Sequence, residues 1–271
     1  MLKTLAGRSK VKKFGWIAAA LMLVPCFANA YVWRAYNHTG TGSSSPGQIS
    51  YWWWDNGAYD GGDLVNYDDS TVIQGPLNGT GSLVNVYADF DVGSVTSGIY
   101  QGSAIVPTTT GPGPTMFNGI VAYEDYCSFR DNSYVGSVNL EFENLDPAYT
   151  YNIYMYGDRG YADGDPTQRL LNAWIYDVDG FDNNTDIQAT RSVANDVGAI
   201  GVRRNTNGLM IEFLNVQPGA DGDIRFWLDM QGAENAQTYM SAFMIEAVPE
   251  PTTVALFGLG GLLLMARRKR K

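Results

Sequence analysis

The chain has 271 residues and a formal net charge of −10, from 28 acidic residues, 18 lysines and arginines and one histidine. The first 30 and the last 21 residues each hold five bases and no acid, so the segment between them has eight arginines against 28 acids, a charge of −20. Such an acidic segment repels phosphate backbones, which excludes nucleic acid as a partner. The single His38 excludes a multi-histidine zinc site, and the absence of lysine from residues 14–268 excludes a Schiff-base lysine there.

The N-terminus has the pattern of a secretory signal. A basic stretch is followed by an apolar run over residues 14–27, and Ala28 and Ala30 supply small residues at the −3 and −1 positions that signal peptidase prefers. We predict a signal helix over residues 1–30 that is cleaved after Ala30. The alternative is a lipoprotein anchored through Cys26, but the proline before this cysteine is unfavourable for lipidation.

The sequence between the two ends predicts one all-β domain over residues 31–247, a single β-sandwich of jelly-roll type. Apolar and polar residues alternate with the period of strands that have one buried face, and Gly, Asn and Asp separate the strands. Two polar segments, 161–168 and 179–186, predict loops, and residues 108–114 predict a flexible loop. The clearest strands are expected at 138–142, 151–155, 209–213, 224–230 and 243–245.

A short motif precedes one of these strands. Leu145, Pro147 and Tyr151 form an L-x-P-x-x-x-Y pattern that resembles the tyrosine corner of Ig-like and fibronectin-type sandwiches, in which the tyrosine hydroxyl returns to the backbone near the turn. Together with Y-N-I-Y-M-Y-G-D-R-G and the final strand, it makes residues 135–247 similar to galactose-binding-like jelly-roll domains. The resemblance implies packing only and transfers no binding residue.

Aromatic residues on the outward side of the expected strands are candidates for carbohydrate contact, because flat rings with polar tips suit the C–H faces of sugars. If the alternating residues of each strand face inward, the remaining rings face outward. The alternative is that a loop or the second sheet covers them, or that they pair with each other across strands. The candidate ligand-binding residues are Tyr154, Tyr156, Trp174, Tyr176 and Trp227.

An acidic segment holds the candidate metal ligands Asp177, Asp179 and Asp182. The spacing does not match an EF-hand, because glycine and the bidentate glutamate do not fall at the required positions. A structural calcium site of another geometry is one interpretation, and a solvated acidic loop is the other. No other cofactor is expected.

No catalytic residue can be assigned, and we expect the domain not to be an enzyme. His38 has no nucleophile motif nearby, and none of the many carboxylates is singled out as a pair for glycoside hydrolysis. Cys127 is the one cysteine left after signal cleavage, so it cannot form an intramolecular disulfide. We expect a buried thiol, with intermolecular pairing as the alternative.

The C-terminus has three consecutive parts, which begin with Pro249, Glu250 and Pro251. The uncharged run over residues 252–266 would span roughly 22 Å as a helix, against about 30 Å of hydrocarbon, so it predicts a short transmembrane helix. Residues 267–271 are all basic. The positive-inside rule keeps both basic ends in the cytoplasm and exports the acidic domain across the inner membrane.

These three parts, over residues 248–271, resemble the PEP-CTERM sorting signal. The resemblance implies that a membrane-embedded exosortase, a cysteine transpeptidase, recognises Pro249, Glu250 and Pro251 and processes the tail. It also implies a Gram-negative host that makes exopolysaccharide. The alternative is an ordinary tail anchor, for which a short helix and a basic stop would suffice.

The sequence therefore predicts an exported, non-enzymatic protein of the cell surface or exopolysaccharide matrix. Signal peptidase and an exosortase are its expected partners during export, the inner membrane holds the precursor transiently, and polysaccharide is a candidate ligand. The first alternative is a carbohydrate-binding module that uses the aromatic sheet face. The second is a glycan-active hydrolase.

Overall fold

The computed structural model describes the chain between Val32 and Pro249 with several gaps. The described residues are 32–38, 54–55, 58–59, 62–91, 99–104, 106–130, 137–161, 169–185, 197–229 and 237–249. The chain divides into a unit Met1–Tyr31 and a unit Val32–Lys271, and the fold described below belongs to the second. The predicted signal helix and the predicted transmembrane helix lie outside the described residues. No helix within the described ranges is long and apolar enough to cross a membrane.

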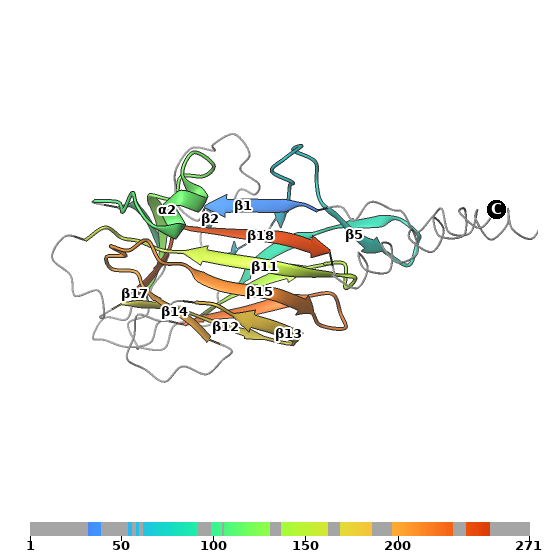
Figure 1. The fold of residues 1–271 in the computed structure, drawn as a ribbon. Helices are drawn as coiled ribbons and strands as arrows, with labels where there is room; N and C mark the ends of the chain where they lie inside the picture. Colours follow the sequence, from blue (N-terminus) through green and yellow to red (C-terminus); the bar gives the residue numbers. More distant parts are fainter. Residues whose placement is uncertain are drawn as a thin grey trace, which may run out of the picture. The chain divides into compact units, whose positions relative to one another are not determined.

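Two antiparallel sheets form the main layers, which confirms the all-β prediction (Figure 1). The five-stranded sheet, nearer the viewer in Figure 1, has the order β1 (Arg34–His38), β18 (Ala242–Pro249), β11 (Tyr149–Tyr156), β15 (Ile211–Pro218) and β13 (Val178–Asn183). The six-stranded sheet behind it has the order β14 (Val197–Gly201), β12 (Leu170–Tyr176), β16 (Ile224–Asp229), β10 (Ser137–Glu143), β7 (Tyr87–Asp91) and β4 (Gly62–Asp63).

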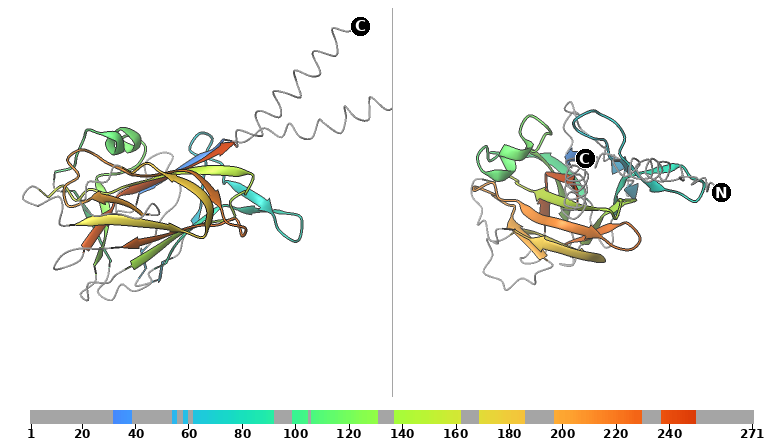
Figure 2. Two further views of the ribbon diagram at one scale, coloured as in Figure 1. Left: turned by 60° about the horizontal axis from the view of Figure 1, so that its bottom comes forward. Right: turned by 45° about the vertical axis from the view of Figure 1, so that its right-hand side comes forward.

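Smaller elements complete the described fold, which Figure 2 shows from two further sides. A three-stranded sheet has the order β17 (Gln237–Met240), β9 (Asp125–Arg130) and β8 (Ile99–Ser103). The short pairs are β2 (Trp54–Asp55) with β3 (Ala58–Tyr59), and β5 (Gln74–Leu77) with β6 (Leu83–Asn85). A single-turn helix, α2, spans Pro112–Phe117.

The core lies between the two main sheets, where the inward side chains of both sheets meet. The ring of Phe142 on β10 contacts that of Phe243 on β18 at a centroid distance of 5.6 Å, and Phe213 on β15 contacts Phe226 on β16 at 5.4 Å. All four rings are fully buried. The alternation in the sequence therefore predicted the inward face of the central strands correctly. A shift by one residue would move the apolar side chains of a strand to the opposite face, so burial of one face fixes the register.

The tyrosine corner is confirmed. The hydroxyl of Tyr151 donates a hydrogen bond of 3.0 Å to the backbone oxygen of Asp146, while Leu145 is fully buried beside the turn. The ring of Tyr151 also packs against Trp33 at 5.7 Å between centroids. This motif thus fixes the turn that enters β11, the central strand of the five-stranded sheet.

Two loop predictions are wrong in part. Most of the segment 179–186 belongs to β13, an edge strand whose backbone pairs with β15 through two irregular registers. Residues 112–114 begin α2, because proline is favourable in the first helical turn, where its missing N–H is not needed. Irregular pairing and a six-residue helix leave no periodic signal in the sequence. The strand predicted to begin at residue 209 begins two residues later, at Ile211.

Candidate functional site

The five aromatic residues predicted to bind a ligand divide between the two main sheets. Tyr154 and Tyr156 lie on β11 of the five-stranded sheet, whereas Trp174 and Tyr176 lie on β12 and Trp227 lies on β16 of the six-stranded sheet. The sheets pack against each other through their inner faces, so outward residues of one sheet cannot share a surface with those of the other. The structure does not bring all five together.

Tyr156 is fully buried, so it does not lie on the open sheet face where the sequence placed it. Its ring packs against Phe117 of α2 at 6.2 Å and against Tyr123 at 5.9 Å between centroids. Burial raises the pKa of the Tyr156 hydroxyl far above its ordinary value. The segment around α2 covers this end of the outer face, and the sequence had no signal for that cover.

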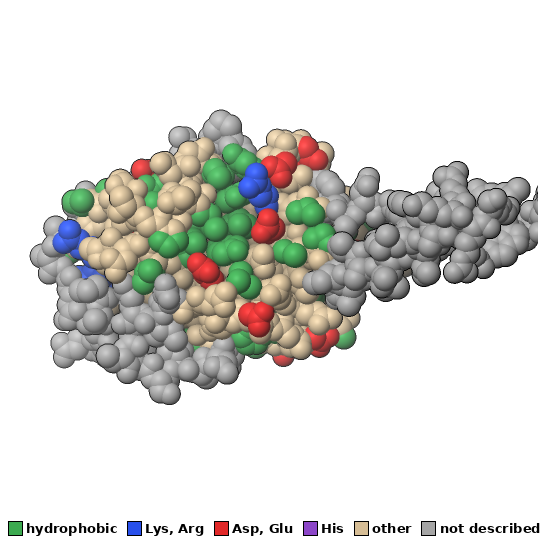
Figure 3. All heavy atoms as spheres, viewed as in Figure 1, with side chains coloured by type: hydrophobic (Ala, Val, Ile, Leu, Met, Phe, Trp, Pro, Cys, Tyr) green, Lys and Arg blue, Asp and Glu red, His purple; other side chains and the backbone are tan. Residues whose placement is uncertain are grey.

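Tyr154 lies on the outer face of the same sheet and is half-buried. In the register of the sheet it stands between Met244 of β18 and Glu212 of β15. Figure 3 shows hydrophobic side chains gathered in the middle of this face, with acidic groups around them. Tyr154 therefore belongs to a surface separate from that of the tryptophans.

The other three aromatic residues share the outer face of the six-stranded sheet, as their alternation predicted. Trp174 stands directly opposite Trp227, and Tyr176 stands opposite Arg225 in the β12–β16 register. Trp227 is 49% exposed and Tyr176 is 37% exposed, while Trp174 is half-buried. We call Trp174, Tyr176 and Trp227 the aromatic face.

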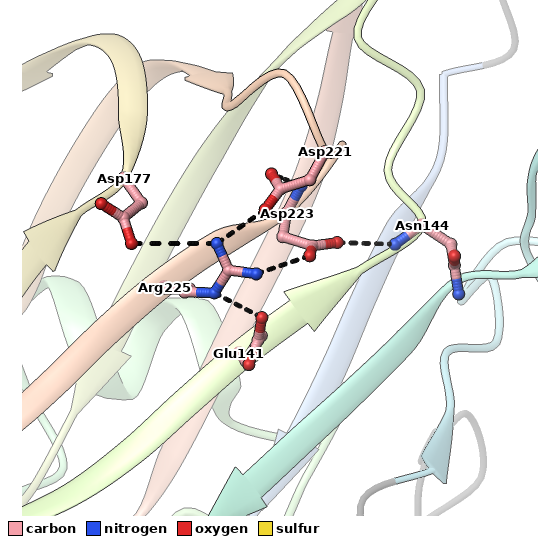
Figure 4. Close-up of polar contacts among 6 residues, drawn as sticks. All are labelled: Glu141, Asn144, Asp177, Asp221, Asp223 and Arg225. Carbon is pink, nitrogen blue, oxygen red and sulfur yellow. Dashed lines mark hydrogen bonds and ion pairs between the residues drawn. The ribbon is translucent and has the colours of Figure 1, made fainter.

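A charged cluster adjoins the aromatic face and centres on Arg225 (Figure 4). Its Nε contacts Oε1 of Glu141 at 2.5 Å, and its two terminal nitrogens each donate a 2.8 Å hydrogen bond, to Asp221 and to Asp223. A fourth carboxylate, that of Asp177, lies 3.9 Å from Nη1. We call these five residues the Arg225 cluster.

The Arg225 cluster was not predicted from the sequence. Alternation places Arg225 and Glu141 outward, but their pairing requires the register of β16 against β10, and Asp177 comes from a distant turn. No local pattern carries this information, because the four acids belong to three separate segments of the chain.

The electrostatics of the Arg225 cluster follow from its partial burial. The hydrogen bond from Arg225 lowers the pKa of Asp221, which is well exposed. Burial raises the pKa of Glu141 and of Asp223, although the charge of Arg225 opposes the shift in both. One guanidinium group thus forms ion pairs with the acids next to the aromatic face, and these acids differ in the direction of their pKa shifts.

The three candidate calcium ligands do not form a shared site. Asp177 points toward Arg225, whereas Asp179 and Asp182 lie exposed on β13, where Asp182 accepts a 2.8 Å hydrogen bond from Nδ2 of Asn215. Across the described part of the chain, no group of three His, Cys, Asp or Glu side chains is placed to hold a metal ion.

The first residue of the sorting motif is part of the folded domain. Pro249 is the last residue of β18 and pairs with Tyr149 of β11, while the buried Ala247 donates its N–H to the backbone oxygen of Trp33 at 2.9 Å. The sorting motif therefore follows the sheet with no intervening linker.

The remaining predicted sites are only partly covered by the described residues. Glu250, Pro251, Ala28 and Ala30 lie outside them. His38 ends β1, and Cys127 lies on β9 between β8 and β17, but their side chains are not described.

Comparison with known families identifies the C-terminal segment. Residues 247–271 match the family model described as "PEP-CTERM protein-sorting motif". The search of curated proteins and the search of solved structures each found no match. The chain carries a PEP-CTERM sorting motif, and this motif indicates an exported protein whose membrane-anchored precursor is processed by an exosortase at the cell envelope.

Proposed function

We propose that the protein is a non-enzymatic component of the cell surface or of the extracellular polysaccharide matrix in a Gram-negative bacterium. Signal peptidase removes residues 1–30, the C-terminal segment holds the precursor in the inner membrane, and an exosortase acts near Pro249, Glu250 and Pro251. The observation that carries the proposal is the PEP-CTERM match, which begins at residue 247 in the last strand of the β-sandwich and continues beyond it.

The position of the motif supports delivery of a complete domain. All described strands end at or before Pro249, so cleavage beyond this residue leaves both main sheets intact. β18 lies between β1 and β11 in the five-stranded sheet, which ties the C-terminal end of the domain to its core. The sandwich is thus suited to be the cargo of the sorting signal.

The Arg225 cluster supports a structural role for the acids beside the aromatic face. A glycoside hydrolase needs one carboxyl group that donates a proton and a second that acts as base or nucleophile. Here Glu141, Asp221 and Asp223 are all paired with Arg225, which fixes the orientation of the three carboxyl groups. This favours a non-enzymatic surface over the hydrolase alternative.

The proposal is tested by expressing the tagged, full-length protein in its host with and without the exosortase. With the exosortase we expect a shorter protein outside the inner membrane, because the tail has been processed. Without it we expect the longer precursor to stay in the membrane fraction. The same size and location in both strains would show that the sorting proposal is wrong.

The aromatic face favours a second candidate function, the binding of carbohydrate by this domain. Trp174 and Trp227 are direct cross-strand neighbours, and the exposed ring of Tyr176 lies one position further along the same strand face. Neighbouring exposed rings can stack on the apolar face of a sugar.

This second function is tested by measuring binding to the polysaccharide of the host. The double substitution Trp174→Ala with Trp227→Ala should abolish binding that the aromatic face provides. Tyr154→Ala is the matched control, because it removes a ring from the other sheet. Binding that survives the double substitution would exclude this face.

A further inference from the structure

Two leucines are exposed side by side on the hairpin that β5 and β6 form. Leu77 of β5 stands opposite Leu83 of β6 in the register, and the exposed fractions of these residues are 64% and 54%. No other large hydrophobic residue in the described ranges is as exposed. Side chains of opposite residues in a strand pair point to the same face, so the two leucines form one apolar surface. We call residues 74–85 the leucine hairpin.

Hydrogen bonds within the turn hold the tip of the leucine hairpin in one conformation. The side-chain oxygen of Asn78 accepts a 2.9 Å hydrogen bond from the N–H of Thr80 and a 3.1 Å hydrogen bond from the N–H of Ser82. The N–H of Asn78 donates to the backbone oxygen of Ser82 at 2.7 Å. Gly81 has φ of 83°, a conformation that glycine adopts without steric cost. The turn therefore keeps the two leucines together at the tip.

The leucine hairpin is uncharged, although the protein around it is strongly acidic. Residues 70–88 contain no Asp, Glu, Lys or Arg, whereas residues 31–250 together carry −20. Anionic lipid headgroups attract basic segments and repel acidic ones. An uncharged hairpin can therefore approach a membrane surface from which the acids of the domain are repelled.

The leucine hairpin lies at the end of the domain where β18 ends, as Figure 1 shows for β5 and the arrowhead of β18. The side-chain nitrogen of Asn144 donates to the backbone oxygen of Asn85 at 3.1 Å. A Cβ atom on Gly75 would overlap the backbone oxygen of Asn144, so the hairpin packs closely on this turn. The turn leads into Tyr149, which pairs with Pro249. The hairpin and the last residue of β18 are thus joined through one turn.

The apolar C-terminal run also begins at this end of the domain. It starts at Thr252, three residues after Pro249, and three extended residues span at most about 11 Å. Val32, which is 51% exposed, lies at the same end, because the backbone oxygen of its neighbour Trp33 accepts the N–H of Ala247. A precursor held in the membrane by this run therefore keeps the end that carries the leucine hairpin close to the lipid surface.

We propose that the leucine hairpin inserts Leu77 and Leu83 into the outer surface of the inner membrane while the precursor is anchored there. Apolar side chains are stabilised at the boundary between headgroups and acyl chains. Two leucines bind weakly by themselves, but the C-terminal anchor makes their contact intramolecular and so favours it. The insertion would orient the domain and hold the Pro249 motif at the membrane surface, where an exosortase acts. This inference rests on the membrane-anchored precursor of the proposed function.

A second copy of the chain is a less suitable occupant of the leucine hairpin. Each partner of a stable protein complex buries about 800 Å², far more than two exposed leucines provide. A lipid surface needs no matching shape and is already close to the hairpin in the anchored precursor. The observations therefore favour lipid.

Quenching of tryptophan fluorescence by brominated lipid tests the proposal. The precursor is purified from the host without the exosortase and incorporated into phosphatidylethanolamine–phosphatidylglycerol vesicles, with acyl chains brominated near the headgroup or unbrominated. Gly79→Trp adds an indole at the hairpin tip, where nothing lies within 4 Å of an added Cβ atom. Thr115→Trp is the matched control, because this exposed residue belongs to α2, which packs on Tyr156 at the other end of β11.

We expect bromination to quench the indole added at residue 79 at least about twofold more strongly than the indole added at residue 115, because only the hairpin enters the lipid. Leu77→Ser with Leu83→Ser, introduced into the Gly79→Trp protein, should lower the quenching to the level of the control. Equal quenching of the two added indoles, or undiminished quenching in the leucine variant, would overturn the proposal. If circular dichroism shows that the leucine variant is unfolded, the comparison of Gly79→Trp with Thr115→Trp decides.

Two further outcomes separate this proposal from its alternatives. Protection of the indole at residue 79 from iodide, without quenching by brominated lipid, would show that protein covers the hairpin and would overturn insertion into lipid. Flotation of the vesicles tests the anchor separately. A precursor that does not float with the vesicles would overturn the membrane-anchored state and this inference with it, whereas a floating precursor without quenching at residue 79 would overturn this inference alone.

Discussion

At the scale of single residues, the polar groups of two side chains join segments that lie apart in the fold. The Tyr151 hydroxyl closes the turn before β11, and Arg225 joins carboxylates from three segments on the outer face of the six-stranded sheet. The sequence predicted the first, because the spacing of the tyrosine corner is local. It could not predict the second, because the partners of Arg225 are set by the pairing of distant strands.

Tyr151→Phe tests the tyrosine corner. The substitution removes the 3.0 Å hydrogen bond to Asp146 and keeps the buried ring, so we expect the free energy of unfolding to fall by about 1 kcal/mol. Urea unfolding followed by tryptophan fluorescence measures this change. Tyr176→Phe, at an exposed position, should change it by less than about 0.5 kcal/mol. Equal midpoints for the Tyr151 variant and the wild type would show that the hydroxyl does not stabilise the turn.

Arg225→Gln tests the Arg225 cluster and its dependence on pH. At pH 7 we expect a loss of about 1–3 kcal/mol, because the half-buried Glu141 and Asp223 lose their cation. The variant Arg34→Gln, which loses one exposed ion pair, should lose less than about 1 kcal/mol.

The sign of the pH effect follows from the acids. Arg225 lowers the pKa of Asp221 in the folded protein, so this stabilisation is present above the ordinary carboxyl pKa and is lost as the pH falls through the lowered value. Burial raises the pKa of Glu141 and Asp223, which favours their protonation in the fold. The difference in the free energy of unfolding between the wild type and Arg225→Gln should therefore become smaller as the pH falls below about 4. If this difference stays constant between pH 7 and pH 3, the ion pairs of Arg225 do not account for the stability that the variant loses.

At the scale of elements, the sequence predicted the central strands well, but it did not predict the edge strand β13 or the helix α2 that packs on β11. Strands such as β10 and β16 are buried on one face along their whole length, so alternation marks them. The edge strand β13 and the short helix α2 take their conformation from the neighbours they contact, and the local sequence does not encode that contact. This is why Tyr156, beneath α2, was predicted to be open to a ligand.

Gly113→Ala tests the packing of α2 on β11. A Cβ atom at this position would lie 2.3 Å from Cδ2 of Tyr156, so the helix or the ring must move. We expect a loss of about 1–3 kcal/mol in the free energy of unfolding. Gly79→Ala is the matched control, because nothing lies within 4 Å of its Cβ atom, and its change should stay within about 0.5 kcal/mol. Equal stability of the two variants would show that close packing of α2 on Tyr156 does not stabilise the fold.

At the scale of the whole molecule, the sign of the charge divides the chain into three parts. The two basic ends adjoin apolar segments, and the segment between them, residues 31–250, carries −20. The sequence predicted this division and the sorting motif because both are properties of contiguous residues. It could not predict that Arg159 and Arg169 both lie over the ring of Tyr239, because Tyr239 is far from both in the sequence.

The most direct test of the sorting account is the intact mass of the protein recovered outside the cell, together with mapping of its terminal peptides. The account predicts an N-terminus at Tyr31 and a C-terminus altered at or beyond the Pro249 motif, without the basic residues 267–271. The exported protein would then keep the complete sandwich. Recovery of an exported protein that still ends at an unmodified Lys271 would contradict processing by an exosortase.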